Sequence, residues 1–341
     1  MCGISGIVKL NRKSFNWSEL FKINNTISHR GPDDEGYTFF DLDNHYPVYG
    51  KSTPEYVKNS SLDYSPKANI DSIPQDVILG LAHKRLSIID ITENGHQPMC
   101  DISSRYWLTF NGEIYNYKEL RNQLENKGYK FRTNTDSEII IYSYIQWKEQ
   151  CLDKLDGMWA FCIYDKKNHY LFGARDRFGV KPMYYYKSDN IFAFASEIKS
   201  LIELDEYKKG LNSAAVFDYL ALGKSELGEE SMFKNIYELP SSNYFTLDLK
   251  TNKFIVNNYY KLQYNKSFGK FNKLEFNYHV SEIKKLLTNS INEHLQADVP
   301  IGTCLSGGID SSAIVGCVDS ISKINNHKVF TACFNDSIDE S

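Results

Sequence analysis

The sequence predicts two units in succession: a mixed α/β (α+β) unit of stacked sheets flanked by helices, then the opening of a parallel α/β unit. The chain has 341 residues, more than the roughly 250–300 at which a single hydrophobic core stops growing. Over the first two hundred residues, short strand-like runs outnumber long helices, which favours stacked sheets covered by helices. Near the end, a strand, a glycine loop, a helix and a strand follow one another, which is typical of a parallel sheet.

The elements of the first unit follow from apolar periodicity and capping residues. Strands are predicted at residues 4–10, 106–110, 158–164, 170–174, 183–187 and 191–196. Apolar residues at helical spacing predict helices at 17–27, 118–127 and 136–147. Gly128 is the expected left-handed stop of the second helix, and Thr135 with Asp136 caps the third. Residues 45–76 lack periodicity and are interpreted as a loop insertion.

The pattern of apolar residues changes near residue 274. Helical spacing of apolar residues over 283–295 is followed by a predicted strand at 299–305, a helix at 310–324 and a strand at 329–334. Residues 211–262 are interpreted as connecting structure. We therefore expect domains at 2–209 and 273–341, joined by a segment at 210–272.

Composition excludes several classes of protein. The balance of 39 basic and 43 acidic residues gives a net charge of −4, so no basic excess exists to bind nucleic acid. The N-terminus lacks a secretory pattern, and the longest apolar stretch, near 139–145, is too short to cross a membrane. The seven cysteines form no C-x-x-C pair, so neither disulfides nor a zinc site is expected, and a cytoplasmic location follows.

Cys2 is the first candidate for chemistry. Removal of Met1 would give Cys2 a free α-amine, whose pKa of about 7.7–8.0 lets it accept the proton of the thiol. One residue then supplies both nucleophile and base, as in N-terminal threonine hydrolases. By itself, a cysteine at position 2 can equally be an inert second residue.

Further motifs follow Cys2 in order. Residues 1–6 read M-C-G-I-S-G, 29–36 read H-R-G-P-D-D-E-G, 82–90 read A-H-K-R-L-S-I-I-D, 110–116 read F-N-G-E-I-Y-N, 176–185 read D-R-F-G-V-K-P-M-Y-Y, and 195–199 read A-S-E-I-K. Over roughly residues 2–200, this pattern resembles the class II glutamine amidotransferases. The resemblance implies a glutaminase with the N-terminal-nucleophile αββα sandwich fold.

The resemblance also implies roles for matching residues. Cys2 would attack the side-chain amide of glutamine, and Asn111 with Gly112 would hold the oxyanion. Arg85 would bind the α-carboxylate of glutamine. The remaining implied residues of the glutamine pocket are Leu86, Ser87, Ile88 and Ile89, with Glu113 and Asp136 as acceptors for the α-ammonium.

The residues themselves leave simpler readings open. Arg85 can be a surface charge at the end of a strand, and Asp136 can be only a helix cap. His29 suggests a catalytic triad with Cys2, but we reject that reading because the family needs no histidine base.

A second site is predicted in the loop S-G-G-I-D-S-S at residues 306–312. Two glycines allow backbone N–H groups to form an anion nest at a helix N-terminus. No Walker A pattern occurs. The loop resembles the pyrophosphate loop of ATP-dependent amide-forming synthetases, although a plain glycine turn remains the alternative. The resemblance implies a parallel ATP-pyrophosphatase (adenine nucleotide hydrolase-like) fold and an ATP site formed by Leu305, Ser306, Gly307, Gly308, Asp310, Ser311 and Ala332.

Together the two sites resemble the glutamine-hydrolysing asparagine synthetases. The resemblance implies ammonia passing from Cys2 to β-aspartyl-AMP, with ATP and Mg²⁺ as cofactors, aspartate as co-substrate, no metal held by protein ligands alone, and a homodimer. An acceptor other than aspartate, such as a sugar acid, and a non-catalytic partner role are the alternatives. Sugar-phosphate and phosphoribosyl amidotransferases are excluded because they lack S-G-G-I-D-S.

Two departures from the family pattern are visible. Residues 241–243 read S-S-N, where the family usually has proline and glycine, and we expect an altered turn there. Family members continue for some two hundred residues or more beyond the position where this sequence stops. We therefore expect these 341 residues to hydrolyse glutamine without making asparagine.

Overall fold

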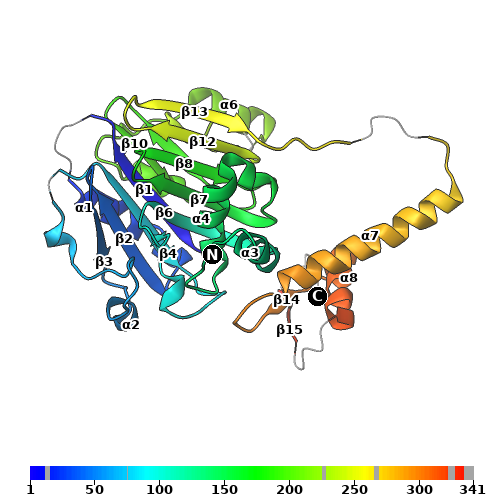
Figure 1. Ribbon diagram of the computed structural model, residues 1–341. Coiled ribbons are helices and arrows are strands. Elements are labelled where there is room, and N and C mark those ends of the chain that lie inside the picture. Colours follow the sequence, from blue (N-terminus) through cyan, green and yellow to red (C-terminus); the bar gives the residue numbers. More distant parts are fainter. Residues whose placement is uncertain (12–15, 75, 225–227, 265–268, 322–326, 334–341) are drawn as a thin grey trace. The chain divides into compact units, whose positions relative to one another are not determined.

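The computed structural model describes residues 1–11, 16–74, 76–224, 228–264, 269–321 and 327–333, in two compact units (Figure 1). The first unit is Met1–Lys261 and the second is Leu262–Ser341. The division differs from the expected one, because residues 210–261 belong to the first unit. Three strands in this stretch join the sheets of that unit, so their backbone hydrogen bonds tie the expected connecting segment to it.

The first unit contains a seven-stranded antiparallel sheet with the order β11-β9-β10-β1-β4-β2-β3. In that order its strands are Ile236–Glu238, Tyr184–Lys187, Ile191–Ala195, Gly3–Lys9, Leu79–Arg85, Asp34–Phe40 and His45–Tyr49. The second sheet has six strands in the order β13-β12-β8-β7-β6-β5. These strands are Lys253–Asn258, Asn243–Asp248, Tyr170–Arg175, Gly157–Asp165, Tyr106–Ile114 and Met99–Cys100.

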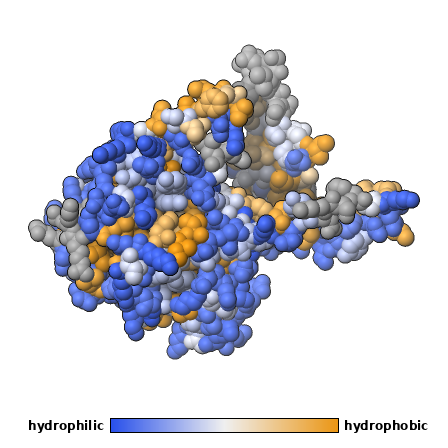
Figure 2. Space-filling model, turned by 90° about the horizontal axis from the view of Figure 1, so that it is seen from above, coloured by the Kyte–Doolittle hydropathy of each residue, from blue (hydrophilic) through white to orange (hydrophobic). Residues whose placement is uncertain are grey.

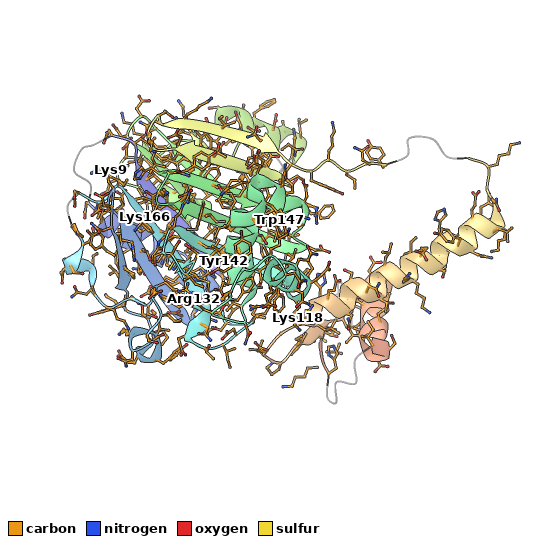
Figure 3. All side chains as sticks on the ribbon, viewed as in Figure 1. Lys9, Lys118, Arg132, Tyr142, Trp147 and Lys166 are labelled. Carbon is orange, nitrogen blue, oxygen red and sulfur yellow. The ribbon has the colours of Figure 1, made fainter. Side chains whose placement is uncertain are left out.

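The two sheets stack face to face, with β1 and β4 contacting β6. Alternation along β1 divides its side chains: Ile4 and Val8 enter the core between the sheets, and Ile7 enters the core beneath the helices. Side chains fill the space between the sheets (Figure 3). On the face seen in Figure 2, the surface of this unit is mainly hydrophilic, with small hydrophobic patches.

Helices cover both outer faces of this sandwich. Helices α1 (Ser18–Asn25) and α5 (Ile198–Ile202) pack on the seven-stranded sheet. Helix α4 (Asp136–Trp147) packs on β6, with α3 (Tyr117–Glu125) beside it. The αββα architecture predicted for this unit is therefore confirmed.

Two sequence interpretations were wrong. Residues 45–76 are not only a loop, since His45–Tyr49 forms the edge strand β3 and Glu55–Lys58 forms helix α2. Residues 211–262 are not mere connection, since they contain α6 (Ser213–Leu222) and strands β11 to β13. Both regions contain short strands that are fixed by partners elsewhere in the chain, such as the pairing of β12 with β8.

Some local predictions hold at the level of single residues. Gly128 has the left-handed φ of +93° after α3. At the turn before β12, where an altered turn was expected, Ser242 has a φ of +61°, a conformation that glycine adopts at lower cost. The described residues of this unit also form four short 3-10 helices: η1 (Ser28–Arg30), η2 (Ile70–Ser72), η3 (Glu93–Gly95) and η4 (Lys148–Asp153).

The second unit contains the parallel pair of strands that the sequence predicts. Its elements are α7 (Lys273–His294), β14 (Gly302–Cys304), α8 (Ile309–Ile321) and β15 (Lys328–Phe330). The strands pair in parallel with Thr303 opposite Val329. Strand β14 is shorter than predicted, and the predicted ends of the last helix and strand reach residues outside the described ranges. No helix in the described part of the chain has the length and apolar character needed to cross a membrane.

Candidate active site

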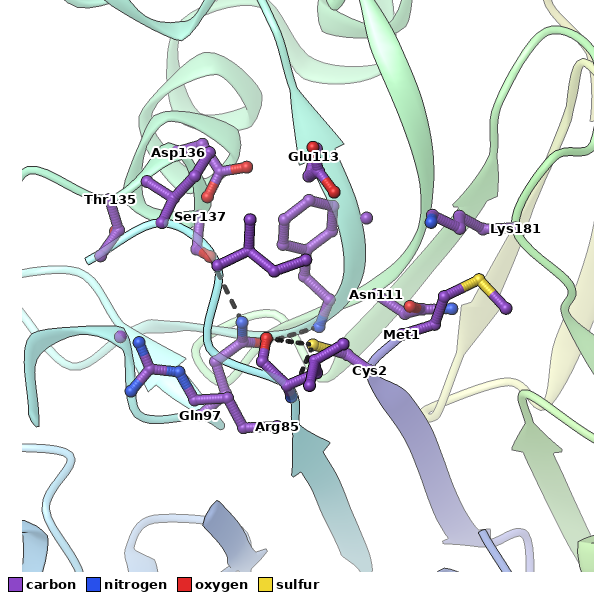
Figure 4. A pocket seen from close by; sticks show the side chains of 16 residues that line it. Met1, Cys2, Arg85, Gln97, Asn111, Glu113, Thr135, Asp136, Ser137 and Lys181 are labelled. Atoms are coloured by element: carbon purple, nitrogen blue, oxygen red, sulfur yellow. Dashed lines mark hydrogen bonds between the residues drawn. The ribbon is translucent and has the colours of Figure 1, made fainter. Parts of the chain in front are cut away.

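Residues from the start of β1, the end of β4, β6 and the start of α4 meet around one pocket (Figure 4). Strand β1 begins at Gly3, which is opposite Lys84 at the end of the antiparallel strand β4. Cys2 and Arg85 therefore lie together, although 82 other residues separate them in sequence. Strand β6, which contacts β1 and β4 from the facing sheet, and the start of α4 complete the site.

These elements enclose a cavity of about 100 Å³. It is lined by Met1, Cys2, Arg85, Leu86, Ile88, Ile89, Gly95, Gln97, Phe110, Asn111, Gly112, Glu113, Thr135, Asp136, Ser137 and Lys181. All the residues expected to bind glutamine are present except Ser87. The backbone N–H of Ser87 donates to the Asp33 carboxylate at 2.8 Å, so Ser87 belongs to the supporting loop. His29 does not line this cavity either, and its Nε2 lies 2.9 Å from Glu197 Oε1.

The Cys2 thiol faces the backbone of Leu86. The Leu86 N–H donates to Sγ at 3.4 Å, and Sγ donates to the Leu86 carbonyl at 3.5 Å. Arg30 Nε donates to the Cys2 carbonyl at 2.8 Å, which fixes the start of β1. Burial raises the pKa of the thiol, against the opposing effect of the Leu86 N–H. A thiol in this state needs a nearby base before it can act as a nucleophile.

Asn111 lies beside Cys2 in the cavity wall and is fully buried. Neither its side-chain oxygen nor its nitrogen has a hydrogen-bond partner among the described residues. Buried amides are nearly always bonded, so this one is available to a ligand. The arrangement fits a donor for an oxyanion.

The backbone N–H of Gly112 is directed to the same side. Along β6, the N–H of Phe110 donates to Gln97 Oε1 and the N–H of Ile114 donates to Asp136 Oδ2. Alternate N–H groups of a strand point the same way, so the Gly112 N–H lies on this edge, away from β7. A Cβ at Gly112 would lie 2.2 Å from the Met158 carbonyl oxygen, which is why only glycine fits.

Asp136 and Glu113 place two carboxylates in the cavity. The helix cap is Thr135, whose side chain accepts the N–H of Glu138, so Asp136 is more than a cap. Asp136 Oδ2 accepts the Ile114 N–H at 3.0 Å. Burial raises the pKa of Asp136 to about 7, and the nearby charge of Glu113 adds to that effect. Such a pair suits a cationic ligand, whose charge would favour the ionised form of Asp136.

Arg85 is buried, so it is not the exposed strand-end charge that the sequence left open. Its Nη1 donates to the Thr92 carbonyl at 2.7 Å, and its Nη2 donates to the Asp90 carbonyl. Gly95 lies against this guanidinium, since a Cβ there would be 1.8 Å from Nη2. The loop therefore holds the guanidinium in the wall of the cavity, where its other N–H groups can meet an anion.

Sequence reasoning did not assign four polar residues of the cavity to the site: Gln97, Thr135, Ser137 and Lys181. Gln97 connects β6 to α4, because its Oε1 accepts from Phe110 N–H and its Nε2 donates to Ser137 Oγ at 3.3 Å. Nothing in its sequence context signals this role. Lys181 is almost fully buried. Its signal was the D-R-F-G-V-K motif, which contributed only to the family resemblance.

In the second unit, the glycine loop joins β14 to α8 as expected. The Leu305 N–H donates to the Phe330 carbonyl at 2.8 Å, and Gly307 has a φ of +75° that favours glycine. Ser311 Oγ donates to the Gly308 carbonyl at 3.1 Å and lies 3.3 Å from the Ser306 nitrogen. A glycine turn with serine hydroxyls before a helix fits a phosphate group.

The other expected ATP residues, Asp310 and Ala332, lie at the start of α8 and just after β15. Within the described ranges, no group of three His, Cys, Asp or Glu residues could hold a metal ion. The glycine loop and its serine hydroxyls fit the phosphates of ATP.

Two family models match the chain, one in each unit. The family model described as "Glutamine amidotransferase domain" matches residues 71–260, and the model "Asparagine synthase" matches residues 282–341. The fold also resembles that of the solved glutamine phosphoribosylpyrophosphate amidotransferase from B. subtilis. That comparison has a TM-score of 0.53 and 16% identity, and covers 97% of this chain and 65% of the other.

Among curated relatives, the chain is 34% identical to the putative asparagine synthetase [glutamine-hydrolyzing] 2 of Methanocaldococcus jannaschii, over 100% of this chain and 61% of the relative. It is 35% identical to the asparagine synthetase [glutamine-hydrolyzing] 1 of Bacillus subtilis, over 92% of this chain and 43% of the relative. The chain thus spans between about two fifths and three fifths of the length of these relatives. The chain belongs to the glutamine amidotransferase family, whose domain is followed here by asparagine synthase sequence.

Proposed function

We propose that the first unit hydrolyses glutamine to glutamate and ammonia, with Cys2 as the nucleophile. The observation that carries the proposal is the fully buried, unbonded amide of Asn111 beside Cys2 in a cavity that also contains Arg85, Glu113 and Asp136. Each part of a glutamine molecule has a complementary group there. Arg85 suits the α-carboxylate, the two carboxylates suit the α-ammonium, and Cys2 meets the side-chain amide.

The reaction requires that Met1 be removed. The free amine of Cys2 then accepts the thiol proton, and Sγ attacks the amide carbon of glutamine. Asn111 and the Gly112 N–H stabilise the negative oxygen that forms. Collapse of this intermediate breaks the C–N bond, the leaving nitrogen takes the proton and departs as ammonia, and a glutamyl thioester remains on Cys2. Water hydrolyses that thioester to glutamate and restores the thiol.

The second unit is proposed to bind ATP through the glycine loop between β14 and α8. When bound, ATP with Mg²⁺ would activate a carboxylate as its acyl-AMP, and the names of the relatives support aspartate as that substrate. Ammonia would then give asparagine. The proposal includes the cytoplasmic location and the homodimer that the family resemblance implies.

The glutaminase proposal is tested by glutamate release from the purified chain. The intact mass should show loss of Met1, and Cys2→Ala should abolish glutamate release. Cys317→Ala, which changes a partly exposed thiol of α8, should leave it unchanged. Full release by Cys2→Ala, or by protein that retains Met1, would overturn the proposal.

The ATP proposal is tested by calorimetric titration with MgATP. Gly307→Ala should weaken binding at least tenfold, because the left-handed φ of +75° disfavours a side chain. Gly316→Ala is the matched control, since a Cβ at Gly316 in α8 would meet no atom within 4 Å. Equal affinity of the two variants for MgATP would contradict the assignment of this loop.

A further inference from the structure

The motif at 176–185 builds a fixed loop between β8 and β9. The carboxylate of Asp176 accepts three N–H groups of its own loop, from Phe178 at 3.0 Å, Val180 at 2.9 Å and Lys181 at 3.0 Å. It also accepts the Trp159 N–H at 3.2 Å, which ties the loop to β7. A buried carboxylate with four donors leaves the backbone of this loop little freedom.

Arg175, the last residue of β8, also holds this loop through its guanidinium group. Its guanidinium donates to the carbonyl of Lys181 at 2.8 Å, to that of Gly179 at 2.7 Å and to that of Leu239 at 2.7 Å. Ser242 adds a bond from its Oγ to the Arg177 carbonyl at 2.7 Å. Hydrogen bonds to β7, to the end of β8 and to the segment before β12 thus fix the position of the Lys181 backbone.

The result is that the Lys181 side chain enters the glutaminase cavity. It is 5% exposed and lines the cavity with Cys2, Asn111 and Glu113 (Figure 4). Burial lowers the pKa of Lys181, while the charges of Glu113 and then Cys2 favour its ammonium form. A buried cation is costly unless it serves an interaction that offsets its desolvation.

We propose that Lys181 controls the charge of the Cys2 amine: its ammonium disfavours protonation of that amine and so keeps the base for the thiol neutral. This inference rests on the proposed glutaminase. It makes Lys181 a positioning residue, because it acts through the amine and needs no contact with glutamine. No role for Lys181 follows from the oxyanion donors or from the groups that bind glutamine.

The electrostatics around the chain terminus agree with this role. In the chain with Met1, burial lowers the pKa of the terminal amine, and the charges of Arg30 and Lys181 lower it further, against Cys2 and Glu113. Removing Met1 moves the terminal nitrogen to the residue that bears the thiol. The charged or titratable groups of the other elements that line the cavity or bond to this terminus are Arg30 from η1, Arg85 from β4, Glu113 from β6 and Asp136 from α4.

The charge of Lys181 determines the direction in which the pKa of the Cys2 amine should shift. Loss of the Lys181 charge raises the pKa of the Cys2 amine, and the neutral amine is then present only at higher pH. A charge within about 4–6 Å of a titratable group shifts its pKa by about one unit or more. Lys181→Met should therefore move the acidic limb of kcat upward by about one pH unit, with roughly tenfold loss below the limb and little loss above it.

The test measures kcat at saturating glutamine from pH 5.5 to 9.5, so that titration of Asp136 acts on KM. Lys181→Met and Lys181→Gln should shift the limb, and Lys181→Arg should restore it. Lys187→Met is the matched control, because Lys187 is exposed at the end of β9. The pH dependence of Cys2 alkylation by iodoacetamide, measured without glutamine, should shift in the same direction.

The outcomes separate this inference from the proposed function. If Cys2→Ala retains glutamate release, the glutaminase itself is wrong. If Cys2 is required but the Lys181 variants keep the wild-type limb, or lose activity equally at every pH, only the role of Lys181 is overturned. If only the KM for glutamine rises, Lys181 acts through Glu113 and the inference is also overturned.

Discussion

Replacing Asn111 by leucine should separate activity from stability. The Asn111 amide is fully buried and has no partner among the described residues. A buried polar group in this state costs about 1–3 kcal/mol of folding free energy. Leucine has a similar size and no polar atoms, so Asn111→Leu removes this cost and should raise the free energy of unfolding by roughly 1 kcal/mol or more.

The same substitution removes a donor to the oxyanion. Loss of one such donor typically costs about 2.7–4 kcal/mol of transition-state stabilisation, which corresponds to a 10²–10³-fold lower kcat. The KM for glutamine should change little, because the donor acts mainly in the transition state. The variant should therefore be a more stable and much less active protein.

The assay combines glutamate release with thermal unfolding followed by circular dichroism. For a unit of this size, 1 kcal/mol corresponds to a Tm change of about 2–4 °C. Thr38→Val is the control, since the Thr38 hydroxyl is also buried and unbonded among the described residues but lies outside the cavity. It should keep full activity. A leucine variant with near-normal kcat and a lower Tm would refute the reasoning, because Asn111 would then be a structural residue.

Three further predictions follow from the site and its supports. Because burial raises the pKa of Asp136 to about 7, the folded state binds an extra proton between about pH 4 and 7. The free energy of unfolding should fall as pH rises through that window, and urea titrations should show this slope disappear in Asp136→Asn, which should also raise the KM for glutamine. Gly95→Ala places a Cβ 1.8 Å from Arg85 Nη2; we expect at least a tenfold higher KM with a smaller change in kcat, and unchanged kinetics would contradict the Arg85 assignment. Lys84 forms a buried ion pair with Glu35; Lys84→Met should lower the unfolding free energy by about 3–5 kcal/mol, and Glu35→Gln in the same chain should recover part of it in urea denaturation.

The sequence predicted the elements that have strong local signals. Helix α4 begins and ends where periodicity and the Thr135 cap place it. The stop at Gly128 has the expected left-handed φ. Strand β3 and strands β11 to β13 were missed, because these short strands gain their stability from partners elsewhere in the chain. The pairing of Tyr244 with Ala174 is an example that no local window contains.

The candidate site was predicted as a set of residue types and not as a geometry. The motifs assigned Cys2, Asn111 and Asp136 to one pocket, and the structure brings them together. It also shows what the motifs did not: the unbonded state of the Asn111 amide, and the presence of Lys181 in the cavity. These properties depend on burial, which is a sum over many distant neighbours.

By itself, the sequence determined the order of the units, the ends of the best-capped helices and the chemical groups available for catalysis, because those properties belong to residues and their near neighbours. The tertiary structure alone decided which strands close the sandwich, that Arg85 is buried against Gly95, and that the loop fixed by Asp176 directs Lys181 toward Cys2. Charges and hydrogen bonds act through space, and only the folded chain sets the distances and the burial that give them their strength.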